Sequence, residues 1–374
     1  MSVIAIAAGG TAGHINPAIA LAQELRERGH EVRFYGTERG MESRLVPQEG
    51  FAFEGLDVSG FDRSRPWTAV SAFFKMRSAR RHVLDEFDRG DRPAAAVGFG
   101  AYVCFPLADA AAARGIPLVL HEQNSVPGMA NKALAKRASV LALTYPSSEA
   151  LFAGRTGRGT KVVALGNPVR RSILDATREQ GRAALGLPAD ATVLLVFGGS
   201  LGARHLNRAL AALKERILAH EGTYVLHAAG AKDHEEALAA LGLTEGEKAR
   251  WRVMPYIDDM ASCLAAADLV VSRSGASSVA EIAARCVPSV LVPYPHATAD
   301  HQTTNARLLS DAGGAVVVAD DRIDGEEFAR TVLGLLSDPS RRAAMAAALE
   351  GLGQAGAASR LADAVEAAAR GAAR

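Results

Sequence analysis

Two glycine-rich segments of this chain contain the residue types of phosphate- and sugar-binding loops. They are residues 7–14 (AAGGTAGH) and 196–203 (VFGGSLGA). In each segment an apolar run is followed by two glycines, a hydroxyl residue and, two residues later, a further glycine. A helical pattern follows each loop, at residues 17–28 and 206–219. The first turn of a helix offers backbone N–H groups and the positive end of the helix dipole, which together bind phosphates. The repeat predicts two similar halves that hold a phosphorylated ligand across a cleft.

The first half contains two candidate sources of a catalytic base. His14 closes the first glycine loop at the start of its helix. The helix dipole disfavours protonation there, so a neutral imidazole facing the cleft could take the proton of a sugar hydroxyl. The alternative is that His14 only caps the loop. Residues 121–124 (HEQN) follow another strand of the same half and form a second polar group that we expect to face the cleft.

The second half contains polar residues suited to a nucleotide sugar. The loop at 274–278 (SGASS) opens a helix, and Glu281 lies further along it, where a carboxylate can accept both hydroxyls of a ribose. The alternative for Glu281 is a solvated surface charge. Gln302 and Asn305 lie one turn apart and could bind sugar hydroxyls with paired donors and acceptors. Arg170 could meet the charge of a diphosphate.

Several classes of function are disfavoured. The first loop is not GxGxxG and no acidic residue ends the second strand, so a nicotinamide cofactor is not expected. The chain lacks an Asp-x-Asp pair for a divalent cation, so no metal is expected either. A formal net charge of +1 argues against a nucleic-acid binder. Three widely spaced cysteines favour neither disulfides nor a metal site, and we expect a reducing cytoplasm.

Short apolar runs that alternate with helical stretches must position these residues. Strands separated by helices form parallel sheets covered on both faces, so we expect an α/β protein with two doubly wound domains. Strands are predicted at 3–8, 32–35, 94–97, 118–120, 140–143, 193–197, 224–227, 269–272, 290–292 and 315–318.

A chain of 374 residues exceeds what one hydrophobic core usually fills. We place the first domain at 1–165, a linker at 166–187 and the second domain at 188–374, with the last helix able to pack back on the first domain. The apolar run at 3–8 is too short for a signal peptide and reads as a buried strand. No apolar run approaches the ~20 residues that span a bilayer.

Residues 63–81 differ from the rest of the chain because they combine basic and aromatic side chains without any acidic one. One interpretation is a core helix with a solvated basic face. The other is an interfacial helix that inserts aromatic side chains among anionic lipid headgroups. The residues concerned are Arg63, Arg65, Trp67, Val70, Phe73, Phe74, Lys75, Met76, Arg77, Arg80 and Arg81.

Seven motifs occur in order along the chain. They are GGTAGH (9–14), HEQN (121–124), GNPVR (166–170), GGSLGA (198–203), YIDDM (256–260), SRSGA (272–276) with Glu281, and PHATADHQ (295–302) with Asn305. Together they resemble the bacterial MurG family of glycosyltransferases. The resemblance implies a GT-B fold, with two Rossmann-like domains facing across a cleft, and no cofactor. It implies transfer of N-acetylglucosamine, with inversion, from UDP-N-acetylglucosamine to the 4-hydroxyl of the N-acetylmuramoyl unit of lipid I, making lipid II for peptidoglycan.

The resemblance also implies roles for single residues. The second domain would bind the donor: Ile257 would meet the uracil through its backbone, Glu281 the ribose, and Ser200 with the loop at Ala276, Ser277 and Ser278 the diphosphate. Arg170 would help to clamp the nucleotide. His14 would be the general base. Residues that would contact or border the sugar are Thr11, Asn124, Gln302 and Asn305. Their neighbours Ala12, Gly13, Val279 and Ala280 are further substrate-binding candidates. Ala12 stands where the family has glycine, so either its φ is negative or the loop approaches the sugar less closely.

The first domain would then bind the membrane-anchored acceptor. This favours the interfacial interpretation of residues 63–81 and a peripheral location on the cytoplasmic face of the bacterial cell membrane, with other cell-wall synthesis proteins as candidate partners. Two alternatives are a UDP-N-acetylglucosamine 2-epimerase and a non-catalytic nucleotide-sugar-binding protein. An epimerase has no use for the aromatic and basic segment, and His14 with both glycine loops weighs against the binding protein.

Overall fold

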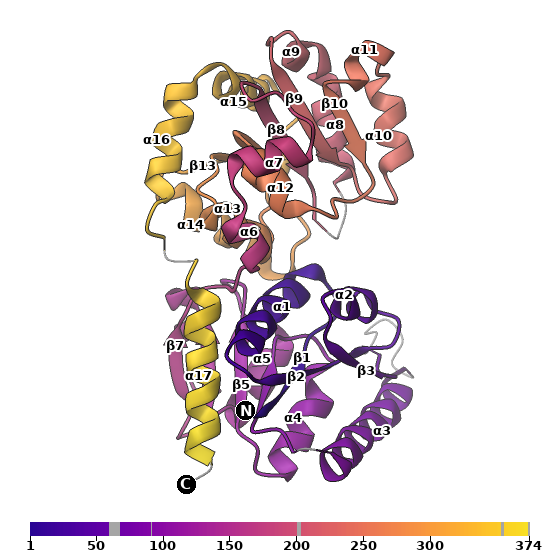
Figure 1. Ribbon diagram of the computed structural model, residues 1–374, viewed down its shortest axis with the longest axis vertical. Coiled ribbons are helices and arrows are strands. Elements are labelled where there is room, and N and C mark those ends of the chain that lie inside the picture. The colour runs from indigo at the N-terminus through magenta and orange to yellow at the C-terminus, as the bar shows by residue number, and fades with distance from the viewer. Residues whose placement is uncertain (60–67, 91, 200–202, 353–354, 373–374) are drawn as a thin grey trace. The chain divides into compact units, whose positions relative to one another are not determined.

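The computed structural model describes the chain except residues 60–67, 91, 200–202, 353–354 and 373–374 (Figure 1). The chain forms two compact units. Unit 1 comprises residues 1–170 and 355–374, and unit 2 comprises residues 171–354. Each unit is a parallel sheet with helices on both faces, as the alternation of apolar runs and helical stretches predicted.

Unit 1 contains a seven-stranded sheet in the order β3-β2-β1-β4-β5-β6-β7, in which every neighbouring pair is parallel. The strands are β1 (Val3–Ala7), β2 (Glu31–Thr37), β3 (Ala52–Leu56), β4 (Ala95–Gly98), β5 (Leu118–Glu122), β6 (Val140–Leu143) and β7 (Lys161–Ala164). The helices are α1 (Ala12–Glu27), α2 (Glu42–Gln48), α3 (Thr68–Arg89), α4 (Cys104–Ala113), α5 (Met129–Leu134) and α17 (Ala357–Ala372), with 3-10 turns η1 (Ala135–Arg137) and η2 (Pro146–Phe152).

The sequence of the central strand β1 has no polar residue, and its place in the sheet explains this. Successive side chains of a strand point to opposite faces of the sheet. Ala5 and Ala7 lie in the core that α3 and α4 cover, and Ile4 and Ile6 lie in the core that α1 and α17 cover. Both faces of β1 are therefore buried, which requires a continuous apolar run.

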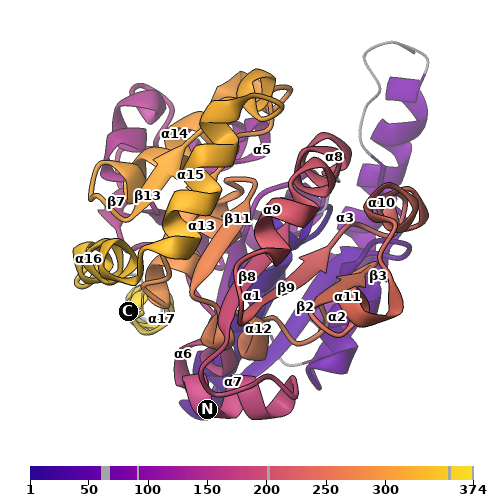
Figure 2. The same ribbon diagram turned by 90° about the horizontal axis from the view of Figure 1, so that it is seen from above.

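Unit 2 contains a six-stranded parallel sheet in the order β10-β9-β8-β11-β12-β13. Figure 2 shows α8, α9 and α15 over one side of β8 and β11, where their apolar side chains form one core with the sheet. The strands are β8 (Thr192–Phe197), β9 (Thr223–Ala228), β10 (Trp251–Met254), β11 (Leu269–Ser272), β12 (Ser289–Leu291) and β13 (Ala315–Val317).

The helices of unit 2 complete both layers around this sheet. They are α6 (Arg171–Asp175), α7 (Arg178–Ala184), α8 (Arg204–Ala212), α9 (Lys214–Leu218), α10 (His234–Leu241), α11 (Glu245–Lys248), α12 (Met260–Ala266), α13 (Ala276–Ala284), α14 (His301–Ser310), α15 (Glu326–Ser337) and α16 (Pro339–Leu349). Two 3-10 turns, η3 (Thr298–Asp300) and η4 (Asp320–Arg322), follow the last two strands.

The ten predicted strands are confirmed, with bounds that differ by no more than two residues. Three strands were missed, and all three lie at the edge of a sheet: β3, β7 and β10. An edge strand has a neighbour on one side only, so it need not be apolar on both faces. No residue of β7 is fully buried, and β3 contains Glu54 and Gly55 in its five residues.

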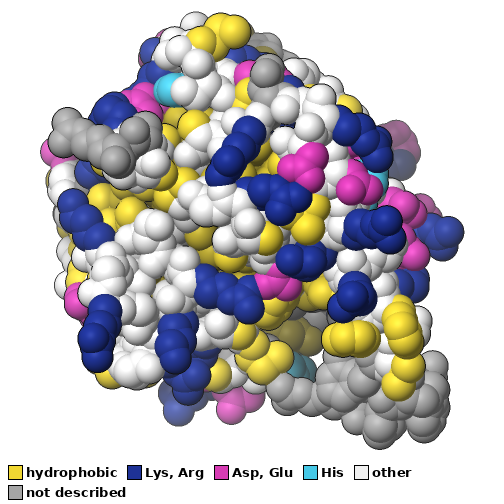
Figure 3. Space-filling model, turned by 90° about the horizontal axis from the view of Figure 1, so that it is seen from below, with side chains coloured by type: hydrophobic (Ala, Val, Ile, Leu, Met, Phe, Trp, Pro, Cys, Tyr) yellow, Lys and Arg dark blue, Asp and Glu magenta, His cyan; other side chains and the backbone are white. Residues whose placement is uncertain are grey.

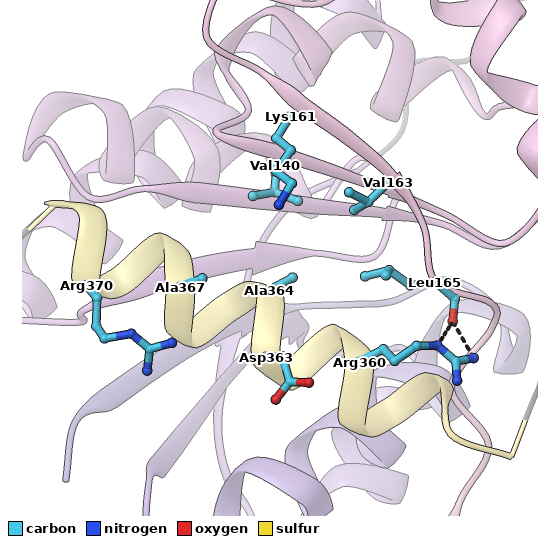
Figure 4. A pocket seen from close by; sticks show the side chains of 9 residues that line it. All are labelled: Val140, Lys161, Val163, Leu165, Arg360, Asp363, Ala364, Ala367 and Arg370. Atoms are coloured by element: carbon cyan, nitrogen blue, oxygen red, sulfur yellow. Dashed lines mark hydrogen bonds between the residues drawn. The ribbon is translucent and has the colours of Figure 1, made fainter.

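The bounds of the two units differ from the sequence-based division. Residues 171–184 form α6 and α7 within unit 2, where the buried guanidinium of Arg182 pairs with Asp268 at 3.0 Å. The C-terminal helix α17 belongs to unit 1 and packs against α1 (Figure 1). Arg28 binds Asp363 at 2.6 Å, and Arg360 donates two N–H groups to the carbonyl of Leu165 at 3.1 and 2.9 Å (Figure 4).

Candidate functional site

The first glycine loop joins β1 to α1, and α1 begins at Ala12, five residues before the predicted helix. Thr11 is the N-cap residue with an extended backbone, and its side chain makes no capping bond. Its Oγ1 instead lies 3.2 Å from Nδ1 of His14, so the hydroxyl sets the orientation of the imidazole. Ala12 is not among the described residues with positive φ, which confirms the first of the two alternatives for this position.

A second loop packs against the imidazole of His14. A Cβ atom on Gly100, which follows β4, would lie 3.2 Å from both Cδ2 and Nε2 of His14. Gly100 has φ +92° and the next residue, Ala101, has φ +61°, a conformation that favours glycine. Because Gly100 has no side chain, the backbone of the turn between β4 and α4 can pack against the imidazole ring of His14.

The HEQN segment at the end of β5 proves to be mostly internal. His121 is buried, its Nε2 lies 2.9 Å from the carbonyl of Gly166 and its Nδ1 lies 3.0 Å from the amide nitrogen of Gln123. Nε2 must donate to that carbonyl, and Nδ1 must accept from the amide, so the imidazole is neutral. Burial lowers the pKa of His121 to about 4. The expectation that this whole group faces a ligand is wrong for His121.

Glu122 and Gln123 are also buried. The Glu122 carboxylate accepts hydrogen bonds from the N–H groups of Asn124 (3.1 Å) and Gly128 (3.0 Å) and from the side-chain amide of Asn131 (2.8 Å). Burial raises the pKa of Glu122, although these hydrogen bonds act in the opposite direction and lower it. Asn124 is half-buried, so it is the residue of the segment that remains suited to a ligand.

A buried carboxylate that sequence reasoning missed lies beneath the first glycine loop. Glu42 accepts hydrogen bonds from the N–H and the hydroxyl of Thr37, at 2.9 and 2.6 Å, and from the N–H of Gly10 at 3.4 Å. A Cβ atom at Gly9, Gly36 or Gly40 would overlap the Glu42 side chain. Three glycines therefore make room for one carboxylate that holds the loop from below, and no local pattern marks that role.

Arg170 is the last residue of the first segment of unit 1, which ends where unit 2 begins. It is mostly buried, and its Nη1 lies 3.9 Å from a carboxylate oxygen of Glu49 at the end of α2. That separation is the outer limit of an ion pair, so Glu49 is a weak partner for the guanidinium. The contact of Arg170 with Glu49 was not predicted.

In unit 2, the loop after β11 opens α13 with Gly275 as its N-cap. Gly275 has no side chain with which to cap this helix, and the backbone N–H groups of the first turn, at residues 276–278, are of the kind that binds an anion. Glu281 lies in the same helix with 6% of its surface exposed. Val279 and Ala280 are buried in the core, so their side chains are not available to a ligand.

Gln302 and Asn305 lie on α14 and are tied to neighbouring loops. The Oε1 of Gln302 accepts from the N–H of Tyr294 at 2.9 Å, and the Ser274 hydroxyl donates to the Gln302 carbonyl at 2.8 Å. The side-chain amide of Asn305, which is fully buried, lies 3.4 Å from the Ser274 carbonyl. These contacts hold α14 against the loop that opens α13.

Ile257 follows β10 in a short loop. Its side chain is buried, which suits a role through the backbone, whereas the neighbouring Tyr256 is exposed. Asp259 caps α12 by accepting from the N–H of Ser262 at 3.0 Å. Ser200 lies outside the described residues. The described ends of its loop are close together, because a Cβ atom on Gly198 would overlap Ala203.

The predicted residues thus form two groups at the carboxyl ends of parallel strands. Unit 1 carries Thr11, Ala12, Gly13 and His14 after β1, Asn124 after β5 and Arg170 after β7. Unit 2 carries Ile257 after β10, residues 276–281 after β11, and Gln302 with Asn305 after β12. This edge is where doubly wound sheets bind ligands. The groove between α17 and β6–β7, lined by Lys161 and Arg370 among others, contains none of them (Figure 4).

Comparisons with known proteins agree with the motifs. Residues 4–142 match the glycosyltransferase family 28 N-terminal domain, and residues 193–365 match the C-terminal domain of the same family. The chain is similar to the UDP-N-acetylglucosamine–N-acetylmuramyl-(pentapeptide) pyrophosphoryl-undecaprenol N-acetylglucosamine transferase of Desulforudis audaxviator, with 40% identity over 94% of each chain. The transferase of the same name from Halothermothrix orenii is 37% identical over 97% of this chain and 98% of its own.

Solved structures place the fold in the same group. The crystal structure of Acinetobacter baumannii MurG is 30% identical, covers 98% of this chain and 99% of its own, and has a TM-score of 0.70. A Listeria monocytogenes protein described as a UDP-N-acetylglucosamine 2-epimerase has a TM-score of 0.69 at 17% identity over 98% and 96% of the two chains, and shows the fold alone. The chain belongs to glycosyltransferase family 28 and, within it, to the MurG family.

Proposed function

We propose that this protein transfers N-acetylglucosamine from UDP-N-acetylglucosamine to the 4-hydroxyl of the N-acetylmuramoyl unit of lipid I, forming lipid II. The observation that supports this most strongly is the full-length similarity to relatives named for that transfer, at 37 and 40% identity. The groups of polar residues at the strand ends of both units are consistent with one donor and one acceptor.

Unit 2 would bind the donor. The first turn of α13 offers N–H groups and a helix dipole to the diphosphate, and the Glu281 carboxylate on the same helix would accept both ribose hydroxyls. Because the Oε1 of Gln302 is taken by the Tyr294 N–H, its NH₂ group is the part that can donate to a sugar oxygen. Arg170 and Ser200 would add to the diphosphate contacts.

Unit 1 would bind the acceptor and supply the base. If Nδ1–H of His14 donates to Thr11 Oγ1, the lone pair lies on Nε2, which is the tautomer a base needs. The acceptor oxygen would attack the anomeric carbon as the bond to UDP breaks, and Nε2 would take the hydroxyl proton. One displacement of this kind converts the α-linked donor into a β-linked product. General-base help is worth about 10² to 10⁴ in rate.

Helix α3 would attach unit 1 to the membrane surface. Its buried side, Ala79, Val83 and Phe87, packs into the core, while Phe73 and Phe74 are 62% and 64% exposed. Figure 3, which views the molecule from below, shows exposed hydrophobic side chains beside Lys and Arg at the margin of the face that it presents. Aromatic side chains next to basic ones fit an anionic interface. Among the described residues, no helix has both the length and the apolar composition needed to cross a bilayer.

Steady-state kinetics with a water-soluble lipid I analogue test the two half-sites separately. We expect Glu281→Ala to raise the KM for the donor strongly, because two charge-assisted hydrogen bonds of about 1.5–3 kcal/mol each are lost. We expect His14→Ala to lower kcat by about 10² to 10⁴ with little change in UDP affinity. Glu235→Ala on α10, which removes an exposed carboxylate, is the control. A normal donor KM in Glu281→Ala, or a normal kcat in His14→Ala, would remove that residue from its role.

Vesicle sedimentation tests the membrane face. The double variant Phe73→Ser with Phe74→Ser should bind anionic vesicles less than the wild type does and keep its turnover of the soluble acceptor. Leu151→Ser, which removes an exposed apolar side chain from η2, is the matched control. Wild-type binding should weaken with salt, since charge contacts to headgroups are screened. Equal sedimentation of the double variant and the wild type would refute the role of α3.

A further inference from the structure

Unit 2 contains a charged network of which only Arg273 belongs to a motif named above. His205 is the second residue of α8, and both of its ring nitrogens face carboxylates. Nδ1 lies 2.8 Å from Oδ2 of Asp320, and Nε2 lies 2.9 Å from Oδ2 of Asp324. Ionised carboxylates only accept hydrogen bonds, so both nitrogens must donate and the imidazole is positively charged in this arrangement. Hydrogen bonds to Asp320 and then Asp324 raise the pKa of His205.

Asp320 also forms an ion pair with a buried arginine. Its Oδ1 lies 2.5 Å from Nη1 of Arg273, which directly follows β11. The same guanidinium nitrogen donates to the carbonyls of Val292 (3.2 Å) and Pro293 (3.3 Å) at the end of β12. Arg273 is almost fully buried, so its charge depends on Asp320 and these carbonyls for compensation.

The network ends at a residue of the donor group. Pro293 is followed by Tyr294, whose N–H binds Oε1 of Gln302 at 2.9 Å. At the other end, α8 begins where the second glycine loop closes, and the Asn207 N–H binds the Ala203 carbonyl at 2.7 Å. A continuous path of contacts therefore runs from the start of α8 to Gln302, the side chain proposed above to bind the sugar.

We propose that His205 is a positioning residue for the donor: in its charged form it holds the start of α8 to Asp320 and Asp324 and, through Asp320 and Arg273, fixes the Tyr294 N–H that orients Gln302. Donor affinity then falls when His205 loses its proton, because a neutral ring can donate from only one nitrogen. This proposal rests on the donor site proposed for unit 2.

The other charged residues near His205 have partners elsewhere. On α8, Arg204 lies 2.9 Å from Asp233 and Arg208 lies 2.5 Å from Glu236, both on the α10 side. On η4, Arg322 lies 3.6 Å from Glu327, and Asp321 is exposed. Among the described residues, Asp320 and Asp324 are thus the carboxylates that bind His205, with Arg273 behind Asp320.

Calorimetric titration of the full-length protein with UDP-N-acetylglucosamine at pH 6 and pH 8.5 tests this. The diphosphate of this donor stays fully ionised over that range, so its charge is the same in both measurements. We expect the wild-type Kd to rise about 3- to 10-fold at the higher pH, as the loss of one partly exposed charge-assisted bond implies. His205→Gln should bind weakly at both pH values, and His205→Arg, which keeps a cation, should bind tightly at both.

Asp324→Asn provides a variant that leaves the buried part of the network intact, since Asp324 is exposed. It should shift the pH dependence of the Kd to lower pH, and in turnover assays the shift should appear in the donor KM and not in kcat. A Kd that is independent of pH in the wild type and unchanged in His205→Gln would overturn the role of His205 while leaving the donor site standing. A wild type that does not bind the donor at either pH would overturn the donor site and this proposal together.

Discussion

Glu42 offers a test of how the first glycine loop is held. Its carboxylate is fully buried, and no ion pair to it is found among the described residues. It accepts three hydrogen bonds, two from Thr37 and one from Gly10. Glu42→Ala would leave these donors without an acceptor and open a cavity among Gly9, Gly36 and Gly40. We therefore expect the variant to destabilise unit 1 and not unit 2.

The size of the effect follows from the donors left behind. A buried donor without an acceptor costs about 1–3 kcal/mol, and removing the buried carboxylate recovers part of that loss as desolvation energy. Because Thr37 is only half-buried, water can replace part of the loss, and we expect about 3 kcal/mol for Glu42→Ala. Glu42→Gln keeps an oxygen for Thr37 but turns an NH₂ group toward Gly10, and should cost about 1–2 kcal/mol.

Hydrogen exchange measures this for each unit separately, which matters because a two-unit chain need not unfold in one step. The protection of the amides of β1 and β2 reports unit 1, and that of β8 and β9 reports unit 2. Glu38→Ala, which removes an exposed carboxylate from the same loop region, is the control. A loss below about 1 kcal/mol in Glu42→Ala would contradict the role of this carboxylate.

Three further variants test other parts of the fold. Ala101→Gly should stabilise unit 1 by about 1 kcal/mol, because φ is +61° at this alanine; slower exchange of the β4 amides would show it, and unchanged exchange would speak against the strain. Burial lowers the pKa of His227 to about 4, so the unfolded chain is protonated first as pH falls, and unit 2 should lose on the order of 3 kcal/mol between pH 6.5 and 4. His227→Gln should flatten that dependence in acid unfolding, and an unaltered slope would refute it. Arg182→Ala removes the buried partner of Asp268, which keeps the half-exposed Arg178 at 2.5 Å, and should cost unit 2 about 1.5–3 kcal/mol in the exchange of β8; a loss under about 1 kcal/mol would count against the pair.

The strands in the middle of each sheet were predictable because their physics is local. β1, and β8 after its first residue Thr192, are buried on both faces, so these residues must be apolar and the run stands out. β3 and β7 lie at sheet edges, where a strand has one neighbour and stays partly exposed. Their residues therefore need not all be apolar, and no apolar run marks them. The sequence allowed the last helix to pack back on the first domain, as α17 does, but the contacts that hold it there, with Arg28 and Leu165, join residues far apart in the chain.

The candidate site shows the same limit. Thr11 and His14 are three residues apart, and their contact follows from one helical turn. His121 was assigned to a ligand-facing group because a polar residue at a strand end is typical of a site, but its partner is the carbonyl of Gly166, 45 residues away. His205 binds Asp320 at a separation of 115 residues. Contacts of this kind appear only when the chain has folded.

The configuration of the new glycosidic bond tests the proposed transfer most directly. The purified protein is incubated with ¹³C-labelled UDP-N-acetylglucosamine and a short-chain, water-soluble lipid I analogue, and the product is analysed by NMR. The account predicts a disaccharide joined by a β-(1→4) bond, formed from the α-linked donor with release of UDP. A product that retains the α configuration would contradict the single displacement. UDP with a 2-epimer of the sugar, or no product at all, would contradict the transferase itself.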